Sequence, residues 1–302
     1  MSPPENPLGF AGLIGWETDD LEKALTAYVS TVSADRRGLP LPGIGSARSF
    51  FENAFQPVLI SDAAFYTGYY EPELPGSLQR TERFCVPLHA PPANLSEGEV
   101  WYDREAIETG NLLAGHEIVW LDDRLEAFLA QVQGSVRIRL ADGGVVRLSF
   151  AAKNNHPYCS IGQELIRRGE GVDGRISVDQ IRLWARRNPD ALGNLLHLNP
   201  SYVFFRKLDL PAEAGPLTTM QRPAVPLRTL AVDPAYVPLG TPVWVEAEGI
   251  RRLMVAQDTG GAIKGAGRGD IYVGSGPEAG RIAGSMQLRG RMVALLPKAE
   301  HD

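Results

Sequence analysis

Two aspartates, Asp258 and Asp270, bracket a glycine-rich loop near the C-terminal end of the chain. A carboxylate at the end of a β-strand is well suited to act as a general acid or base, and glycine lets a backbone approach a ligand closely. We therefore predict that Asp270 and Asp258 are catalytic, and that Gly260, Gly261 and Lys264 bind substrate. The alternatives are aspartates that only cap a turn, as is common beside glycine, and a solvated surface lysine.

Aromatic, hydroxyl and amide side chains form two further clusters that suit a sugar ligand. One contains Thr67, Gly68 and Tyr69, and the other contains Asn155 and Tyr158. Aromatic rings stack on the apolar faces of sugars, while hydroxyls and amides hydrogen-bond sugar hydroxyls and acetamido groups. We predict that these five residues contact substrate. Strand packing is an equally good explanation of the tyrosines, because aromatic residues are favoured in sheets.

The aromatic segment from Phe65 to Pro72 is typical of a strand that ends at a turn. Successive side chains of a strand point to opposite faces. We therefore expect Tyr69 to face the ligand together with Thr67, and Tyr70 to face the core.

Several other kinds of site are excluded by spacing. The triplet Asp258-Thr259-Gly260 matches an aspartic protease, but such a site needs two carboxylates that share a proton, and the triplet occurs once. The glycines match neither GxGxxG nor a phosphate-binding loop, and the histidines lack metal-binding spacing. We expect no metal and no cofactor. Cys85 and Cys159 allow one disulfide or two buried free thiols, and we favour the thiols.

The composition is that of an ordinary globular protein with about two domains. The 302 residues are 44% hydrophobic and 22% charged, with a net charge of −6. That charge argues against nucleic acid as a partner, because nucleic-acid binding relies on a basic surface. No apolar run is long enough to span a bilayer, and the N-terminus lacks the features of a secretory signal.

The pattern along the chain indicates one β-rich domain interrupted by another. Helices are predicted before residue 56, helices and hairpins alternate over 76–204, and short β-rich runs follow from 205. The runs predict a small barrel or sandwich that includes the strand near 65–72. We therefore expect a mainly β fold with some α: a barrel domain of 1–75 with 205–302, which includes N-terminal helices, and an inserted domain of 76–204.

Ordered motifs over residues 60–297 resemble the membrane-bound lytic murein transglycosylase A family. The matching segments are Phe65 to Pro72, Tyr102 to Arg104, Asn155 to Tyr158, Asn199 to Phe205, Thr229 to Asp233, Pro238 to Gly240, Asp258 to Gly265 and Asp270 to Tyr272. The resemblance implies a double-psi β-barrel interrupted by a second β-rich domain, which forms the other wall of a groove for glycan strands.

The resemblance also implies a mechanism. A lytic transglycosylase cleaves the β-1,4 bond between N-acetylmuramic acid and N-acetylglucosamine and leaves a 1,6-anhydro-muramic acid end. Asp270 matches the catalytic aspartate, which serves as the single general acid and base, and Asp258 matches a second aspartate in the groove. Arg268-Gly269 stands where the family usually carries His-Phe. A hydrolytic glycosidase on the same barrel and a non-catalytic glycan-binding or wall-loosening protein are the alternatives.

Further expectations concern location and partners. The family implies the periplasm and commonly a lipid anchor in the outer membrane. Peptidoglycan glycan strands are the expected partner, and other cell-wall enzymes are further candidates. We expect a monomer.

Overall fold

The computed structural model describes residues 7–32, 38–96, 98–211 and 214–298, and the chain divides into two compact units. The first, here named the barrel unit, comprises Met1–Tyr70, Ala214–Gly274 and Glu278–Asp302. The second, the insert unit, comprises Glu71–Glu213 and Ser275–Pro277. The barrel unit is therefore assembled from segments that lie far apart in the sequence.

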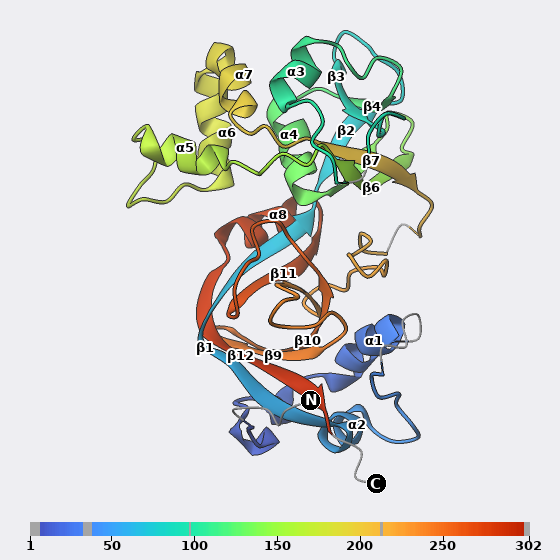
Figure 1. The fold of residues 1–302 in the computed structure, drawn as a ribbon, viewed down its shortest axis with the longest axis vertical. Helices are drawn as coiled ribbons and strands as arrows, with labels where there is room; N and C mark the ends of the chain where they lie inside the picture. The colour runs from blue at the N-terminus through green and yellow to red at the C-terminus, as the bar shows by residue number, and fades with distance from the viewer. Residues whose placement is uncertain (1–6, 33–37, 97, 212–213, 299–302) are drawn as a thin grey trace. The chain divides into compact units, whose positions relative to one another are not determined.

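Six strands of the barrel unit close into a barrel in the order β1-β11-β8-β10-β9-β12 (Figure 1). They are β1 (Phe55–Glu71), β8 (Thr229–Val232), β9 (Pro242–Ala247), β10 (Ile250–Asp258), β11 (Arg268–Ser275) and β12 (Gln287–Pro297). Strand β8 runs parallel to β10 and antiparallel to β11. The structure confirms the predicted β-barrel.

Alternate side chains of the barrel strands pack into two different cores. Val243 and Val245 of β9 belong to a buried cluster that draws on all six strands, as the interior of a closed barrel does. Trp244, between them, belongs to a second buried cluster that includes the N-terminal helices. Because both faces of β9 are covered, its six residues are all buried and apolar residues occupy both faces.

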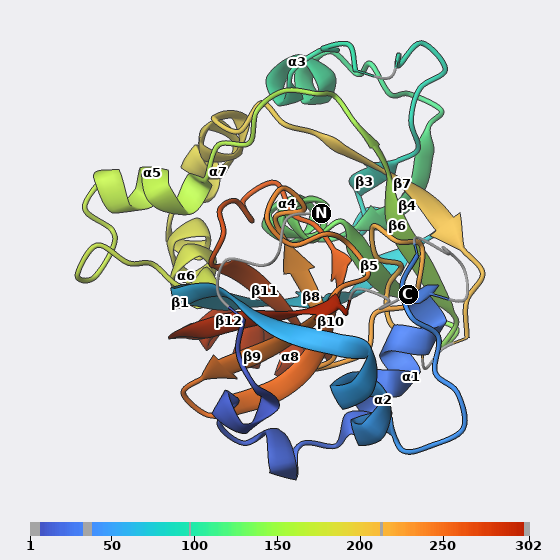
Figure 2. The same cartoon turned by 60° about the horizontal axis from the view of Figure 1, so that its bottom comes forward.

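Two N-terminal helices cover one side of the barrel unit (Figure 2). They are α1 (Leu21–Val32) and α2 (Ala47–Ala54), after the short 3₁₀ turns Phe10–Gly12 and Trp16–Thr18. The side chain of Ser46 caps α2 by accepting a hydrogen bond from the backbone of Ser49. Trp16 packs against Trp244 with its ring centroid 5.3 Å away.

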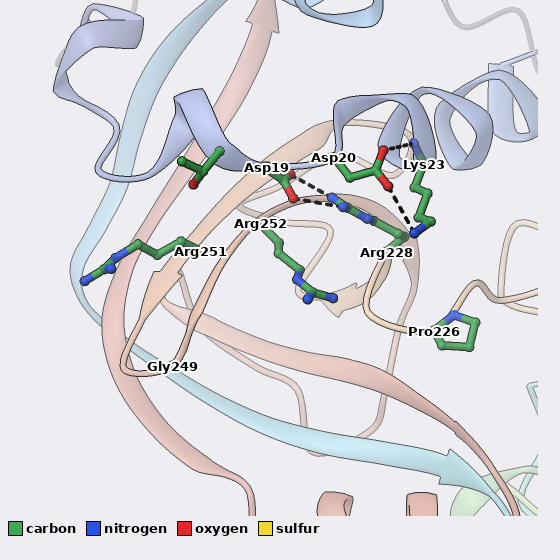
Figure 3. A pocket seen from close by; sticks show the side chains of 9 residues that line it. Asp19, Asp20, Lys23, Pro226, Arg228, Gly249, Arg251 and Arg252 are labelled. Carbon is green, nitrogen blue, oxygen red and sulfur yellow. Dashed lines mark hydrogen bonds and ion pairs between the residues drawn. The ribbon is translucent and has the colours of Figure 1, made fainter.

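A buried ion pair joins the segment before α1 to the barrel strands (Figure 3). Asp19 accepts hydrogen bonds from both terminal nitrogens of Arg228, at 2.7 and 2.8 Å, and one from the backbone of Leu253 at 2.9 Å. The pair borders a surface pocket of about 530 Å³, which shares no lining residue with the glycine-rich loop. The opposite charges of Asp19 and Arg228 balance each other, as a buried ion pair requires.

The insert unit contains a six-stranded sheet in the order β3-β4-β2-β5-β6-β7 (Figure 1). The strands are β2 (Glu73–Ser77), β3 (Val86–His89), β4 (Glu117–Leu121), β5 (Ser135–Arg139), β6 (Val145–Lys153) and β7 (Val203–Leu208). The helices are α3 (Arg104–Thr109), α4 (Arg124–Gln133), α5 (Ile161–Arg167), α6 (Val178–Arg187) and α7 (Pro189–His197). Helix α4 begins after the cap Asp123 and ends at Gly134, which adopts φ 74°.

Two elements differ from the sequence-based expectation. Strand β1 begins at Phe55 and has 17 residues, and its register against β12 shifts twice between Leu59 and Ala64, as at β-bulges, which bend a strand. Helix α8 (Gly276–Ser285) occupies a stretch expected to be β or turn. Glycine has a low helix propensity, so the several glycines of α8 argue against a helix in the sequence. One of these glycines is required for packing. A Cβ at Gly280 would lie 2.7 Å from the ring of Tyr70.

The cysteines are both free and both exposed, so the expectation of buried thiols was wrong. Cys85 lies directly before the edge strand β3, and Cys159 lies directly before the cap of α5, where neither is covered by the core. Among the described residues, no helix is long and apolar enough to cross a membrane.

Candidate active site

The two aspartates of the glycine-rich loop lie on either side of one residue of β8. In the sheet register, Ala231 is the Cα partner of Asp270 on β11 and also of Asp258 on β10. Neighbouring strands lie about 4.8 Å apart, so the two aspartate Cα atoms are roughly 10 Å apart. Strand β11 also neighbours β1, which carries Thr67 and Tyr69. The barrel therefore brings four predicted site residues together.

Among the described residues, a hydrogen-bond donor is found for only one of the two carboxyl oxygens of Asp270. Oδ1 accepts a hydrogen bond from the hydroxyl of Thr67, and none of the described residues donates to Oδ2. Burial raises the pKa of Asp270 to about 6, although the Thr67 hydrogen bond and the charge of Arg268 oppose the rise. The carboxyl can therefore hold a transferable proton close to neutral pH, as a general acid requires.

Asp258 has hydrogen-bond donors on both oxygens. Oδ1 accepts from the backbone and the hydroxyl of Thr219, at 2.9 and 2.8 Å, and from the backbone of Thr259 at 2.9 Å. Oδ2 accepts from the hydroxyl of Tyr69 at 2.9 Å. Burial raises the pKa of Asp258 while these bonds oppose the rise. A carboxylate has about four acceptor sites, so Asp258 has little capacity left for a water or a sugar hydroxyl.

Tyr69 and Tyr70 are both half-buried, which corrects the expectation for Tyr70. The ring of Tyr69 packs on Tyr272 at 5.3 Å, and its hydroxyl points to Asp258. Tyr70 lies against Gly280 of α8, which covers this end of β1. The tyrosine of this segment that is fully buried is Tyr66. The two faces of β1 do alternate as predicted. On the face that carries Tyr66 and Tyr70, Tyr66 packs in the barrel interior and Tyr70 packs against α8.

Gly68 lies where β1 passes close to α8. A Cβ at this position would stand 2.9 Å from the backbone of Ala283 and 3.1 Å from Val273. The absence of a side chain is therefore required for packing. A substrate contact by Gly68 stays a prediction.

The loop after Asp258 presents its predicted substrate contacts to different degrees. Lys264 and Gly261 are exposed, and a Cβ at Gly261 would meet nothing within 4 Å. Gly260 is half-buried against the side chain of Ile263. Lys264 therefore has the freedom to reach a ligand, and the loop around Gly261 leaves room for one.

Three residues that hold this site were not predicted as site residues: Thr219, Asp233 and Arg268. Asp233 accepts a 2.9 Å hydrogen bond from the backbone of Gly265 and so anchors the loop; this and the backbone of Ala235 lower its pKa. Its position directly after the β8 run was a usable signal. Arg268 sits two positions before Asp270, on the same face of the strand. Thr219 gave no signal, since 39 positions separate it from Asp258.

The other two predicted contacts, Asn155 and Tyr158, belong to the insert unit. Asn155 adopts φ 61°, and its side-chain amide donates to the backbone oxygen of Glu99 at 2.7 Å. Tyr158 is 45% exposed. The amide of Asn155 therefore holds a loop, whereas the ring of Tyr158 is free to stack on a ligand. Within the described parts of the chain, no group of three or more His, Cys, Asp or Glu residues could hold a metal ion.

Two family models match this chain. Residues 65–206 match the MltA specific insert domain, and residues 228–296 match the 3D domain. Together the two models cover the residues described above except Thr219, which lies between the matched ranges.

Solved structures and curated proteins agree with these models. The membrane-bound lytic murein transglycosylase of Agrobacterium tumefaciens is 32% identical, covers 97% of each chain and has a TM-score of 0.87. The structure of Escherichia coli MltA with bound chitohexaose is 27% identical over 98% of this chain and 92% of that one, with a TM-score of 0.77.

Curated relatives are longer than the matched part of this chain. The membrane-bound lytic murein transglycosylase A of Escherichia coli is 34% identical over 243 residues, which are 76% of this chain and 65% of that protein. The homolog from Buchnera aphidicola is 32% identical over 62% of its own length. The matched region thus spans less than two thirds of either protein. From the near-complete structural match and both domain models, we conclude that this chain belongs to the membrane-bound lytic murein transglycosylase A family.

Proposed function

We propose that this chain cleaves the β-1,4 bond between N-acetylmuramic acid and N-acetylglucosamine of peptidoglycan as a lytic transglycosylase. The observation that carries the proposal is Asp270. Its carboxyl is buried enough to raise its pKa to about 6, and one of its oxygens has no donor among the described residues. Membership of the family supports peptidoglycan as the substrate.

One carboxyl is sufficient for both proton transfers. Protonated Asp270 first gives its proton to the glycosidic oxygen, so that the bond to the anomeric carbon breaks and an oxocarbenium-like centre develops. The resulting carboxylate then removes the proton from O6 of the same muramic acid, and O6 closes on the anomeric carbon. Asp270 ends protonated, as it began. Because the nucleophile belongs to the substrate, the second step is intramolecular and benefits from proximity.

In this proposal Asp258 acts through its negative charge and does not transfer a proton. Its oxygens are engaged by Tyr69, Thr219 and Thr259, which suits a fixed negative charge and not a base that must bind a proton. A negative charge in the same barrel stabilises a developing oxocarbenium ion and disfavours ionisation of Asp270.

We further propose that residues from both units contact the glycan. Tyr69 and the loop of Gly260, Gly261 and Lys264 supply contacts from the barrel domain of 1–75 with 205–302. The inserted domain of 76–204 supplies the exposed ring of Tyr158 and, through its loop, Asn155. An exposed aromatic ring suits the apolar face of a sugar.

The hydrogen bonds to Asp258 also bear on the alternative that the chain is a hydrolytic glycosidase. An inverting hydrolase needs a second carboxylate that activates water, at a separation of about 6.5–9.5 Å from the acid. Asp258 is the obvious candidate by position, but the donors on its oxygens leave little room for a water. The geometry therefore favours the transglycosylase.

The test is digestion of purified murein sacculi followed by mass spectrometry of the products. We expect fragments that end in 1,6-anhydro-muramic acid, which lack one water relative to hydrolysed fragments. The matched control is Asp270→Asn, which keeps the shape of the side chain and should reduce turnover about 10²–10⁴-fold. Mainly reducing ends would favour the hydrolase. Glycan binding without release of fragments would favour a non-catalytic wall protein.

We also propose a periplasmic location with association to the outer membrane through a lipid. The names of the curated relatives, which are described as membrane-bound, support this. Fractionation of cells that express the native gene tests it, because a soluble cytoplasmic protein would contradict it. Other cell-wall enzymes are proposed partners, and a monomer is the proposed state, which sedimentation would test.

A further inference from the structure

A chain of three hydrogen-bonded side chains runs from Arg268 through Thr67 to Asp270. Nη2 of Arg268 donates to the hydroxyl oxygen of Thr67 at 2.8 Å, and the same hydroxyl donates to Oδ1 of Asp270. All three residues belong to β1 and β11, which are neighbours in the barrel.

Arg268 is held in this position by contacts of its own. Nη1 donates to the backbone oxygens of Gly269, at 2.5 Å, and Phe65, at 3.4 Å. The guanidinium also lies over the ring of Phe65, 5.3 Å from its centroid. Arginine presents its five N–H donors in a rigid plane, so these contacts fix where Nη2 points.

The direction of the chain follows from what each group can do. A guanidinium can only donate, so Arg268 occupies a lone pair of the Thr67 oxygen. The single hydrogen of Thr67 then has Oδ1 of Asp270 as its only acceptor among the described residues. If Oδ1 carried the acid proton, the Thr67 hydrogen would lose that acceptor, and a donor without an acceptor in a partly buried site costs free energy.

We propose that Arg268 is a positioning residue that acts through Thr67: it fixes the Thr67 hydroxyl as a donor to Oδ1, so that the transferable proton of Asp270 resides on Oδ2. This inference rests on the proposed function, in which Asp270 is the acid. Oδ2 is the oxygen without a donor among the described residues. The proton is thereby placed on the oxygen that is available to the substrate.

Other charged and titratable groups also face Asp270. Asp258 on β10 raises the pKa of Asp270, and Arg268 on β11 lowers it. Burial is the main reason why the pKa of the Tyr69 hydroxyl on β1 is raised well above normal, and the charges of Asp258 and Asp270 raise it further. Strand β8 contributes the apolar Ala231 opposite Asp270. A test must therefore separate the hydrogen-bonded path from simple charge.

The test measures the pKa of Asp270 directly, by the ¹³Cγ chemical shift of labelled aspartate, with the signal assigned from its loss in Asp270→Asn. Removal of the cation in Arg268→Gln should raise this pKa by about 1 unit. Thr67→Val should raise it as well, whereas Thr67→Ser, which keeps the hydroxyl, should restore the parent value. In the Thr67→Val background, Arg268→Gln should have a smaller effect than alone, because the path through the hydroxyl is already absent.

Arg289 provides the matched control. It lies over the same Phe65 ring, at 5.6 Å, but it is exposed and no hydrogen bond is found between it and Thr67. Arg289→Gln should leave the pKa of Asp270 unchanged. An equal shift in this variant would show that any nearby cation suffices, and additive shifts in the Thr67→Val and Arg268→Gln double variant would show that Arg268 acts through charge alone. Either result would overturn the proposal.

Neutron diffraction tests the position of the proton itself, which X-ray data at ordinary resolution do not show. At about pH 5, deuterium is expected on Oδ2 of Asp270, and deuterium on Oδ1 would contradict the proposal. These measurements need no turnover. Failure of the proposed function would instead appear as full activity in Asp270→Asn, whatever the proton position.

Discussion

The hydroxyl of Tyr69 on β1 donates a 2.9 Å hydrogen bond to Oδ2 of Asp258 at the end of β10. Strands β11 and β8 stand between β1 and β10 in the barrel, so this bond crosses two strands. It completes the set of hydrogen-bond donors to the two oxygens of Asp258. The bond thus links the strand that carries Thr67 to the second aspartate of the site.

Removal of this hydroxyl tests the link. In Tyr69→Phe the ring can still pack on Tyr272, but Oδ2 of Asp258 loses its donor, so the pKa of Asp258 should rise further. A hydrogen bond to a charged group contributes about 1.5–3 kcal/mol, and we expect a comparable loss of stability together with slower turnover. Thermal unfolding and murein release measure the two effects.

Tyr66→Phe is the matched control for this prediction. It removes a tyrosine hydroxyl from the same strand, one that donates to the backbone of Arg291 at 2.8 Å. We expect a loss of stability without a change in the turnover of the folded enzyme. If both variants slowed turnover equally, the hydroxyl of Tyr69 would have no special relation to the site.

The rate should fall as pH rises through the pKa of Asp270, about 6. The first step requires a protonated acid, and the fraction of protonated Asp270 decreases above this pH. Initial rates of murein release over a range of about pH 4 to 8 give the profile. A rate that instead rises through pH 6 would mean that Asp270 must be ionised in the first step, which is the behaviour of a nucleophile or base.

Asp270→Asn should be more stable than the parent at neutral pH. The pKa of Asp270 is about 6 in the fold and 3.8 without it, so the folded state binds more protons between these values. Stability from this group is therefore present below about pH 4 and is lost as pH rises through about 6. The variant removes this loss, and we expect a gain of about 1–3 kcal/mol near pH 7 that vanishes near pH 3.5.

The same substitution at Asp233 should have the opposite sign. Hydrogen bonds from the backbone of Gly265 and Ala235 lower the pKa of Asp233, so its stabilising contribution is present above the normal aspartate pKa and is lost on acidification. Asp233→Asn should therefore destabilise the protein at neutral pH. Denaturant unfolding of both variants at two pH values decides the matter, and equal signs would contradict it.

Gly68→Ala should destabilise the barrel unit. The new methyl would stand 2.9 Å from the backbone of Ala283, so β1 and α8 would have to separate, which costs about 1–3 kcal/mol in other overpacked sites. The control is Gly284→Ala in the same helix, where a Cβ would meet nothing within 4 Å. That variant should raise the melting temperature slightly, because alanine favours the helix. A similar loss in both variants would mean that the close approach of Gly68 to α8 does not explain the loss.

The sequence predicts much of this architecture because many of its elements carry strong local signals. Asp123 and Gly134 delimit α4 as a cap and a stop, and the apolar runs of β9 and β10 identify buried strands. Asp258 and Asp270 stand out because carboxylates and glycines cluster between two such runs. These features depend on neighbours along the chain.

The features that were missed depend on neighbours in space. Helix α8 contains several glycines, one of which, Gly280, makes room for Tyr70 of β1, and no local rule predicts a helix from them. Thr219 binds Asp258 from 39 positions away, and the face of Tyr70 is decided by that same helix. Sequence periodicity predicts that a strand has two faces. It does not predict which part of the protein covers each face.

The shared register position at Ala231 has a consequence for how such a site tolerates insertions and deletions. The separation of Asp258 and Asp270 is set by the width of three adjacent strands, with β8 in the middle, and not by the residues that connect them. The connecting loop can therefore gain or lose a residue while the two carboxylates keep their spacing. The contour of the loop that we propose to contact the glycan can therefore vary without moving the two carboxylates.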